Sequence, residues 1–223
     1  MKVSGWFLIV TVLFVAALIA SNIIAVKLIV VADRVLPAAI IVFPLSYIIG
    51  DVLTEVYGYR QARRVIWLGF LANLFVVVAI WLGGLLPAAG FWDGQEAYDR
   101  ILGLVPRIMA ASFLAYLLGE FANAYILAKI KIAMEGRLLW VRTIASTIVG
   151  QGIDSGVFIT LAFVGTIPAS VLIELIITQW LVKTAYEAAA TPLTYVTVGF
   201  LKRREEIDTY DTDTRFNPLA ISD

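Results

Sequence analysis

Six long apolar segments, separated by short polar stretches, constrain the fold of this chain more than any other feature. They cover roughly residues 6–28, 36–57, 65–86, 107–128, 139–165 and 170–200. A helix needs about 20 mostly apolar residues to cross the hydrocarbon core of a bilayer, and each segment reaches that length. Because the apolar runs are continuous rather than alternating, helices are favoured over barrel strands. The sequence therefore predicts an all-α polytopic membrane protein with six transmembrane helices.

The composition agrees with a membrane protein and limits the available chemistry. The 223 residues are 61% hydrophobic and 15% charged, whereas soluble domains are about 45–50% apolar and about 25% charged. A net charge of zero gives no reason to expect a nucleic-acid partner. The sequence has no Cys, which excludes thiolate metal sites, and no His, the commonest general base. We find no phosphate-loop, nucleophile-elbow or metal motif, and we expect no enzyme activity and no cofactor.

The first apolar segment is interpreted as a retained span, because its apolar run exceeds the roughly 7–15 residues of a signal-peptide core. We expect residues 1–204 to form one six-helix transmembrane domain. Residues 205–223 are polar and acidic, and we expect them to form a disordered cytoplasmic tail. The last apolar segment is long enough to include a break, which the pattern places before Pro192.

Lys and Arg residues gather in alternate connections between the spans. The cation-rich segments hold Arg60, Arg63, Arg64, Lys129, Lys131, Arg137, Lys202, Arg203 and Arg204. The remaining connections hold few cations, so the positive-inside rule predicts that both termini face the cytoplasm. The 84–106 connection then lies outside the prokaryotic inner membrane. Its Phe91, Trp92 and Tyr98 favour an interfacial segment, and a lid over an outward-facing site is the alternative.

Ionisable residues inside the predicted spans are the main functional signal. They are Asp51, Glu55, Glu120, Arg142, Asp154, Glu174, Lys183 and Glu187. Each costs about 2.5–3.5 kcal/mol at a helix centre on insertion scales, so such groups are functional hypotheses by default. Glu174 lies near the outer end of its helix and is interpreted as a rim residue. Arg142 begins its helix at the cytoplasmic boundary and is interpreted as an anchor.

Helical register places the other polar residues on inward-facing stripes. The stripes contain Tyr47, Asp51 and Glu55; Ser112, Tyr116, Glu120 and Asn123; Thr147, Gln151, Asp154 and Ser155; Gln179, Lys183, Glu187 and Thr191; and Ser21 with Asn22. At 1.5 Å per residue, the central acids and Lys183 lie roughly 16–22 Å from the outer ends of their helices. This shared depth, near the middle of a core about 30 Å thick, predicts a central polar ligand cavity.

The chemistry of this cavity leaves several ligands open. Lys183 and Glu187 are one turn apart and are expected to neutralise each other in part. The remaining carboxylates suit a cation, a proton, or a ligand with adjacent N–H donors. A guanine-type edge offers such donors to one carboxylate, while an amide side chain satisfies its carbonyl oxygen and aromatic rings stack on it.

Several blocks of the sequence are similar to a known family. They include "FPLSYIIGDVLTEVYGYRQARRVIWLGF" (43–70), "GEFANAYILAKIK" (119–131), "RTIASTIVGQGIDSGVFITLAF" (142–163) and "KTAYEAAATPLTYVTVGFLK" (183–202). In these blocks, and in "SNIIAVKL" (21–28), the chain resembles the queuosine-precursor transporters of prokaryotes. The resemblance implies uptake of 7-deazaguanine compounds such as preQ0, preQ1 or queuine. On this resemblance we assign the substrate site to Asn22, Asp51, Glu55, Glu120, Asn123, Gln151, Asp154, Lys183 and Glu187.

Three mechanisms remain open from the sequence. The first is a secondary transporter with a midplane site, coupled to protons through its buried carboxylates. The second is a substrate-binding subunit of an ATP-driven vitamin uptake complex, in which Ala16 and Ala20 form a small-residue surface for a partner helix. The third, an intramembrane protease that uses Asp51 and Asp154, is disfavoured by the family resemblance. The sequence does not distinguish a monomer from a homodimer.

Overall fold

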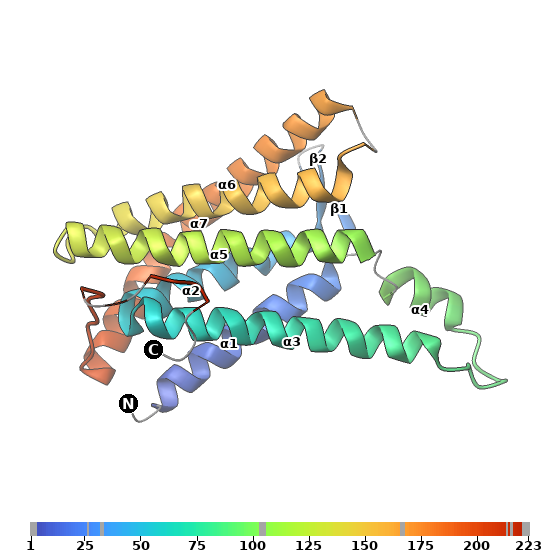
Figure 1. Cartoon of the computed structure of the whole chain (residues 1–223), viewed down its shortest axis with the longest axis horizontal. Helices are drawn as coiled ribbons and strands as arrows, with labels where there is room; N and C mark the ends of the chain where they lie inside the picture. Colours follow the sequence, from blue (N-terminus) through green and yellow to red (C-terminus); the bar gives the residue numbers. More distant parts are fainter. Residues whose placement is uncertain are drawn as a thin grey trace.

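The computed structural model describes residues 4–25, 27–31, 34–102, 106–165, 168–212, 214 and 216–219. Its helices are α1 (Gly5–Ile24), the 3-10 helix η1 (Ala38–Ile41), α2 (Phe43–Tyr57), α3 (Tyr59–Leu85), α4 (Gln95–Leu102), α5 (Pro106–Ala133), α6 (Leu139–Phe163) and α7 (Ala169–Glu205). Six helical segments in this described part are long and apolar enough to cross a membrane, with η1 and α2 together forming the second. The predicted all-α architecture with six spans is therefore confirmed (Figure 1).

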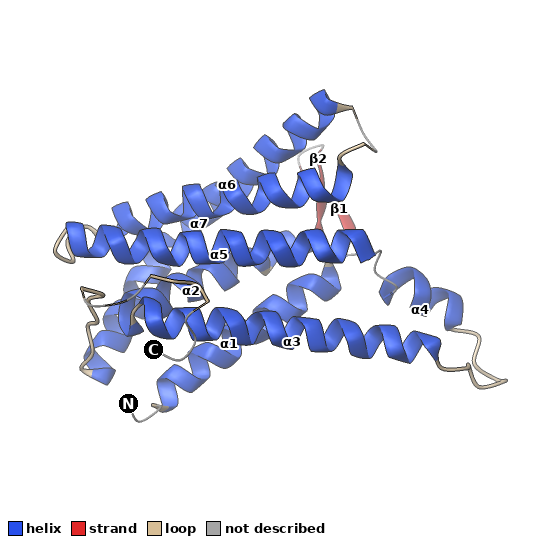
Figure 2. Cartoon of the chain, in the orientation of Figure 1, coloured by secondary structure: helices blue, strands red, loops and turns tan. Residues whose placement is uncertain are grey.

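A short antiparallel hairpin between α1 and η1 was not predicted. It pairs β1 (Leu28–Val31) with β2 (Arg34–Pro37), and Val30 lies opposite Val35 in the register. Figure 2 shows these strands towards the side of the bundle that also carries α4. We call this side the hairpin end.

The start of α1 and the end of α7 both lie at the opposite side of the bundle, which we call the terminal end (Figure 1). Trp6 near the start of α1 packs edge-on against Phe200 near the end of α7, with ring centroids 5.1 Å apart. Phe7 packs in the same way against Tyr57, the last residue of α2, at 4.9 Å. That the terminal end faces the cytoplasm stays a prediction from the distribution of Lys and Arg.

The connection between α2 and α3 differs from the loop expected at residues 57–65. Only Gly58 separates the two helices, and Arg60, Arg63 and Arg64 lie in the first two turns of α3. Gly58 has φ 83° and ψ 164°, a conformation that residues with a Cβ atom rarely adopt. A sharp glycine joint therefore replaces the expected loop.

The break expected before Pro192 is also absent, because α7 runs continuously from Ala169 to Glu205 with Pro192 inside it. Proline is tolerated within transmembrane helices because neighbouring groups satisfy the backbone atoms that it frees. The 84–106 connection contains α4, which is attached to α3 by a hydrogen bond from the Tyr98 hydroxyl to the Ile80 carbonyl oxygen (2.7 Å). Whether this connection acts as a lid stays untested.

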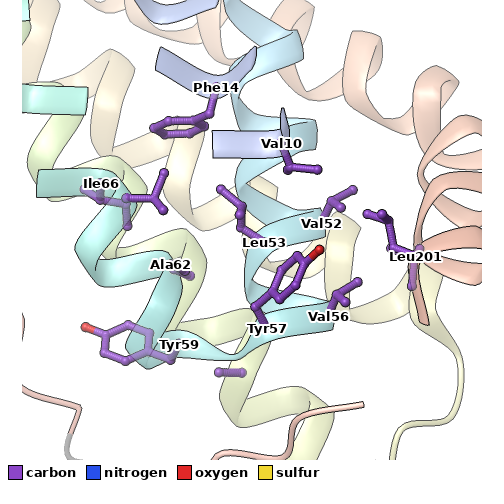
Figure 3. Packing of buried hydrophobic residues seen from close by; sticks show 14 of the residues in the cluster. Val10, Phe14, Val52, Leu53, Val56, Tyr57, Tyr59, Ala62, Ile66 and Leu201 are labelled. Atoms are coloured by element: carbon purple, nitrogen blue, oxygen red, sulfur yellow. The ribbon is translucent and has the colours of Figure 1, made fainter. Parts of the chain in front are cut away.

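An apolar core fills the terminal half of the bundle. Figure 3 shows Val52, Leu53 and Val56 of α2 lying among side chains that include Val10, Phe14 and Leu201. The helix α2 is the most enclosed of the six spans in the described chain. It is therefore the element around which α1, α3, α5 and α7 pack.

The helices α5 and α6 cross closely at two glycines. A Cβ atom built on Gly119 would lie 3.0 Å from the carbonyl oxygen of Gly150, and one on Gly150 would lie 3.0 Å from that of Gly119. The same position on Gly119 is 2.9 Å from the Cβ atom of Asp154. The crossing thus brings the polar stripes of these two helices together.

The described part of the C-terminal tail lies against the first turns of α3. The Asp211 carboxylate accepts a hydrogen bond from the backbone N–H of Tyr59 (2.9 Å). Arg63 donates to the carbonyl oxygen of Asn217 (2.7 Å), and the Trp67 indole N–H donates to that of Pro218 (2.9 Å). The division of the chain at residue 204 stays a prediction.

Candidate functional site

Apart from Asn22, the residues assigned to the site fall into two separate groups, each of which also contains residues that were not assigned to it. The central cluster comprises Tyr47, Asp51, Glu120, Asn123, Gln151, Asp154, Lys183 and Glu187. The terminal ionic cluster comprises Glu55, Lys131, Arg142, Lys202 and Asp208. Asp51 and Glu55 are one turn apart on α2, yet they belong to different groups. Both acids are buried, as the helical register predicts, and their different partners give them different surroundings.

In the central cluster, Asp51 and Glu187 each accept a hydrogen bond from a neighbouring helix. The Asn123 side-chain N–H of α5 donates to Asp51 Oδ1 at 2.7 Å. The Thr147 hydroxyl of α6 donates to Glu187 Oε1 at 2.6 Å. The carboxyl groups of Asp51 and Glu187 also interact electrostatically. Side chains of α2, α5, α6 and α7 therefore meet in one buried polar region.

Lys183 pairs with Asp154 rather than with Glu187, which corrects the expectation from the sequence. The Lys183 ammonium lies 2.6 Å from Asp154 Oδ2 and 4.2 Å from the ring centroid of Phe43. It thus reaches across from α7 to α6 instead of folding along its own helix. The ion pair and the aromatic ring together hold this cation at one side of the central cluster.

Several buried polar atoms of the central cluster have no hydrogen-bond partner among the described residues. They are Tyr47 Oη, Asn123 Oδ1 and both carboxyl oxygens of Glu120. Buried polar side chains are normally hydrogen-bonded, and leaving one unpaired costs roughly 1–3 kcal/mol. Such a concentration of unpaired donors and acceptors is typical of a site that receives a ligand.

A cavity of about 100 Å³ lies on the hairpin side of the central cluster. Its wall is formed by Ser21, Asn22, Ala25, Ala39, Ile40, Phe43, Ser112, Ala115, Asp154, Phe158, Gln179 and Lys183. Asp154 and Lys183 belong both to this wall and to the central cluster. Asn22 lines the cavity from α1 and donates a hydrogen bond to Asn73 of α3 (2.7 Å). The cavity therefore adjoins the central cluster at Asp154 and Lys183.

The terminal ionic cluster is built around Glu55, which is fully buried. Arg142 binds it through two hydrogen bonds, from Nε to Oε2 (2.7 Å) and from Nη2 to Oε1 (2.8 Å). The Lys202 ammonium lies 2.5 Å from Glu55 Oε1. The Lys131 ammonium lies 3.4 Å from the same oxygen and donates to the Glu55 carbonyl oxygen at 2.6 Å.

The tail completes this ionic cluster through Asp208. Its carboxylate lies 2.6 Å from the Lys131 ammonium and 2.9 Å from that of Lys202. Partial burial acts to raise the pKa of Asp208, but the hydrogen bonds from Lys131 and Lys202 outweigh it and lower that pKa. The cluster thus joins four elements, α2, α5, α6 and α7, to the tail.

Two sequence interpretations are wrong at this cluster. Arg142 is not a boundary anchor, because its side chain is 2% exposed and bound to Glu55. Lys131 is not a loop residue, because it lies in α5 and is 1% exposed. Sequence reasoning also missed Phe43 and Lys202. A signal existed for Lys131, which follows Asn123 by eight residues and so shares its helix face.

A model of one protein family, described as "Putative vitamin uptake transporter", matches residues 37–197. The chain belongs to this vitamin uptake transporter family. Within it, the chain is 35% identical over 147 residues to a "Probable queuosine precursor transporter" of Bacillus subtilis (strain 168), covering 65% of this chain and 64% of that relative. It is 29% identical over 121 residues to the "Queuosine precursor transporter" of Escherichia coli (strain K12), covering 54% and 52%.

A third relative, the "Probable queuosine precursor transporter" of Haemophilus influenzae, is 26% identical over 121 residues, covering 54% of this chain and 49% of the relative. The matched regions therefore span about half to just under two thirds of these relatives. The family resemblance seen in the sequence is confirmed, and the chain is a multi-pass membrane protein of a bacterial transporter family. No solved structure was found to match it.

The family match covers the central cluster completely and the terminal ionic cluster in part. It contains every residue of the central cluster, together with Glu55, Lys131 and Arg142. Asn22, Lys202 and Asp208 lie outside it. The matched region thus includes all the unpaired polar atoms next to the cavity.

Proposed function

We propose that this chain is a secondary transporter that imports queuosine precursors, 7-deazaguanine bases such as preQ0 and preQ1, across the bacterial inner membrane. The names of three relatives support the substrate class. The observation that carries the proposal is the central cluster, a buried set of unpaired polar groups beside a cavity between the helices. A transporter needs such a site near the middle of the membrane.

The central cluster offers the groups that a 7-deazaguanine base requires. A carboxylate accepts the adjacent N–H donors of its guanine-type edge, and the Gln151 amide donates to its carbonyl oxygen. The rings of Phe43 and Tyr47, 5.6 Å apart, provide surfaces for stacking. Ligand pockets usually enclose about 300–1,000 Å³, so the cavity of about 100 Å³ must widen when the base binds.

We assign the substrate contacts to the residues around the cavity and the central cluster. They are Asn22, Asp51, Glu120, Asn123, Gln151, Asp154, Lys183 and Glu187. Glu55 was predicted to join them, but its carboxylate is bound by Arg142 and Lys202. We therefore propose that Glu55 acts in closing the terminal end and does not contact the substrate.

The two clusters together fit an outward-facing state of an alternating-access cycle. With the terminal end in the cytoplasm, the cavity lies on the outer side of the central cluster. The apolar core and the terminal ionic cluster then close the inner side. Release of the substrate into the cell requires the ion pairs of Glu55 to separate, since they link α2 to α6 and α7.

We further propose that the inward proton gradient drives this import. The sequence contains no His, so the buried carboxyl groups are the natural proton carriers. A proton-coupled transporter loses substrate accumulation when an uncoupler abolishes the gradient. Accumulation that persists with an uncoupler but requires another ion would contradict this part of the proposal.

The test uses queuosine in tRNA as the readout. A bacterial host that neither makes nor imports precursors is fed preQ0, preQ1 or queuine separately, with and without this gene. We expect at least one of these bases to restore the modification only when the chain is present. Asp51→Asn is expected to abolish rescue, whereas Glu96→Gln, at an exposed residue of α4, serves as the matched control. Absence of rescue by every base, despite insertion in the membrane, would refute the substrate class.

A second experiment distinguishes a secondary transporter from a subunit of an ATP-driven complex. The purified chain alone is reconstituted in liposomes, and exchange of labelled base across the membrane is measured. Exchange without any ATPase supports the secondary transporter. Binding without exchange would favour the ATP-driven complex.

A further inference from the structure

The acids of the central cluster outnumber its cations. Four carboxyl groups, those of Asp51, Glu120, Asp154 and Glu187, lie within it and are at most 4% exposed. Lys183 is the one cation of the central cluster as described, and it is committed to Asp154. Transfer of an unpaired ion into a protein interior costs several kcal/mol even after relaxation. Charge balance therefore requires that some of these carboxyl groups carry protons.

The four carboxyl groups differ in their hydrogen-bond partners. Asp154 accepts from Lys183, Asp51 from Asn123 and Glu187 from Thr147, and each of these donors favours the ionised form of its carboxylate. Asp51 and Glu187 also form a hydrogen bond with each other, which takes one proton between the two carboxyl groups. Glu120 is 1% exposed, and neither of its oxygens has a partner among the described residues. Glu120 therefore has no donor that stabilises its negative charge.

The surroundings of Glu120 add negative charge and no cation. The titratable side chains that face it are Tyr47 and Asp51 of α2, Tyr116 of its own helix, Asp154 of α6 and Glu187 of α7. The described helix α1 places the apolar ring of Phe14 beside the same Gly50 position. Lys131 and Arg142 are occupied in the terminal ionic cluster.

Gly50 sets the position of the Glu120 carboxyl group. A Cβ atom built on Gly50 would collide with Glu120 Oε1, so the carboxyl group occupies the space that a side chain on α2 would fill. Glu120 thus lies directly against α2, one residue before Asp51. The carboxyl group of Glu120 is therefore buried against α2 with no hydrogen-bond partner among the described residues.

From this geometry we infer that Glu120 is the proton-binding residue of the carrier. This inference rests on the proposed function. Glu120 takes a proton from the outside before the base binds and keeps it while the base crosses the membrane. The protonated carboxyl group has an O–H donor for an acceptor atom of the base or of the Gln151 amide. After the base leaves, the proton passes to the cytoplasm and Glu120 returns to its ionised form.

Infrared difference spectroscopy tests the proton site without any substrate. The purified chain is shifted between acidic and alkaline buffer, and the carbonyl stretch of protonated carboxyl groups is recorded in H₂O and D₂O. Because the sequence has no His, proton uptake near neutral pH reports mainly on carboxyl groups. We expect Glu120→Gln to remove one buried carboxyl band, Glu120→Asp to keep it at a shifted frequency, and Glu96→Gln to leave it unchanged. An unchanged band in Glu120→Gln would overturn the inference.

Transport in liposomes tests the coupling itself. With the lumen one pH unit more alkaline, the wild-type chain is expected to accumulate neutral preQ0 about tenfold if one proton accompanies each base. Glu120→Gln is expected to exchange labelled preQ0 at equilibrium but to reach only equal concentrations on both sides. Tenfold accumulation by Glu120→Gln would refute the inference. Exchange of labelled preQ0 by the same variant would still support the proposed transport function. Failure of the wild-type chain to exchange any precursor would instead refute the proposed function, and the infrared result stands independently.

Discussion

The central cluster and the terminal ionic cluster both contain buried acids on the same face of α2, but they differ in how those acids are satisfied. Glu55 accepts hydrogen bonds from Arg142 and Lys202, so its negative charge is fully neutralised. Asp51, one turn away, accepts a hydrogen bond from a neutral amide. A satisfied ion network stabilises one arrangement of helices, whereas an unsatisfied polar cluster has free capacity for a ligand. Burial of an acid alone therefore does not indicate its role.

The largest effect is expected from breaking the terminal ionic cluster at Arg142. Removal of one partner from a buried ion pair destabilises a protein by about 3–5 kcal/mol, because the other charge is left without compensation. Lys202 and Lys131 still face Glu55 in Arg142→Met, so this variant is expected to lower the unfolding free energy in detergent by at most about that amount. The double variant Arg142→Met with Glu55→Gln is expected to recover much of the loss. If the single and the double variant were equally destabilised, the charge of Glu55 would not be the cause of the lost stability.

A smaller effect, on binding rather than on stability, is expected in the central cluster. Asp51→Asn removes a charged acceptor, and hydrogen bonds to charged groups contribute about 1.5–3 kcal/mol. The variant is expected to bind preQ0 at least tenfold more weakly with little change in its melting temperature. Binding by the detergent-solubilised chain, measured by isothermal titration calorimetry, provides the check. If Asp51→Asn lost stability but kept its affinity for preQ0, Asp51 would have a structural role like that of Glu55.

The glycine crossing that brings the polar stripes of α5 and α6 together gives a third comparison. A methyl group on Gly119 would lie 2.9 Å from the Asp154 Cβ atom, so Gly119→Ala is expected to destabilise by about 1–3 kcal/mol through overpacking. Gly156→Ala, which meets nothing within 4 Å on α6, is the matched control and should be neutral or slightly stabilising. Thermal unfolding of both variants is compared. Equal melting temperatures would mean that the crossing can relax without cost.

The smallest effect is expected at the exposed edge of the terminal ionic cluster. Asp208 is 44% exposed on its side chain, so its ion pairs are screened by water and contribute at most about 1 kcal/mol. Its lowered pKa means that this stability is present above the pKa of the unfolded chain, about 3.9, and is lost as the pH falls through the folded value. The unfolding free energies of Asp208→Asn and wild type should therefore converge at acidic pH. A constant difference across the pH range would contradict the assignment.

Much of the architecture follows from patterns that depend on the sequence alone. The hydropathy predicted all six spans, and helical register brought Asp51, Glu120, Asp154 and Glu187 to one interior region. Both signals are periodic and local, so no knowledge of neighbouring helices is needed to use them. The interior position of these side chains was predictable for that reason.

The pairing of the charges could not be predicted in the same way. Lys183 is one turn from Glu187 but binds Asp154 on another helix, because its long side chain extends towards the cavity. Lys131 and Lys202 resemble the cations that flank a span, but both contact Glu55. These contacts depend on helix crossings, such as the one at Gly119 and Gly150, that single-helix periodicity does not encode.

The helix α7 runs unbroken through both clusters, so a tilt of this helix at one cluster would move its residues in the other. Lys183 in the central cluster and Lys202 in the terminal ionic cluster belong to this one helix and lie about 28 Å apart along it. A tilt of about 10° around Lys183 would swing Lys202 by about 5 Å, further than its ion pair with Glu55 can stretch. In the proposed transport cycle, a small tilt of α7 when the base binds would therefore separate Lys202 from Glu55 at the opposite end of the bundle.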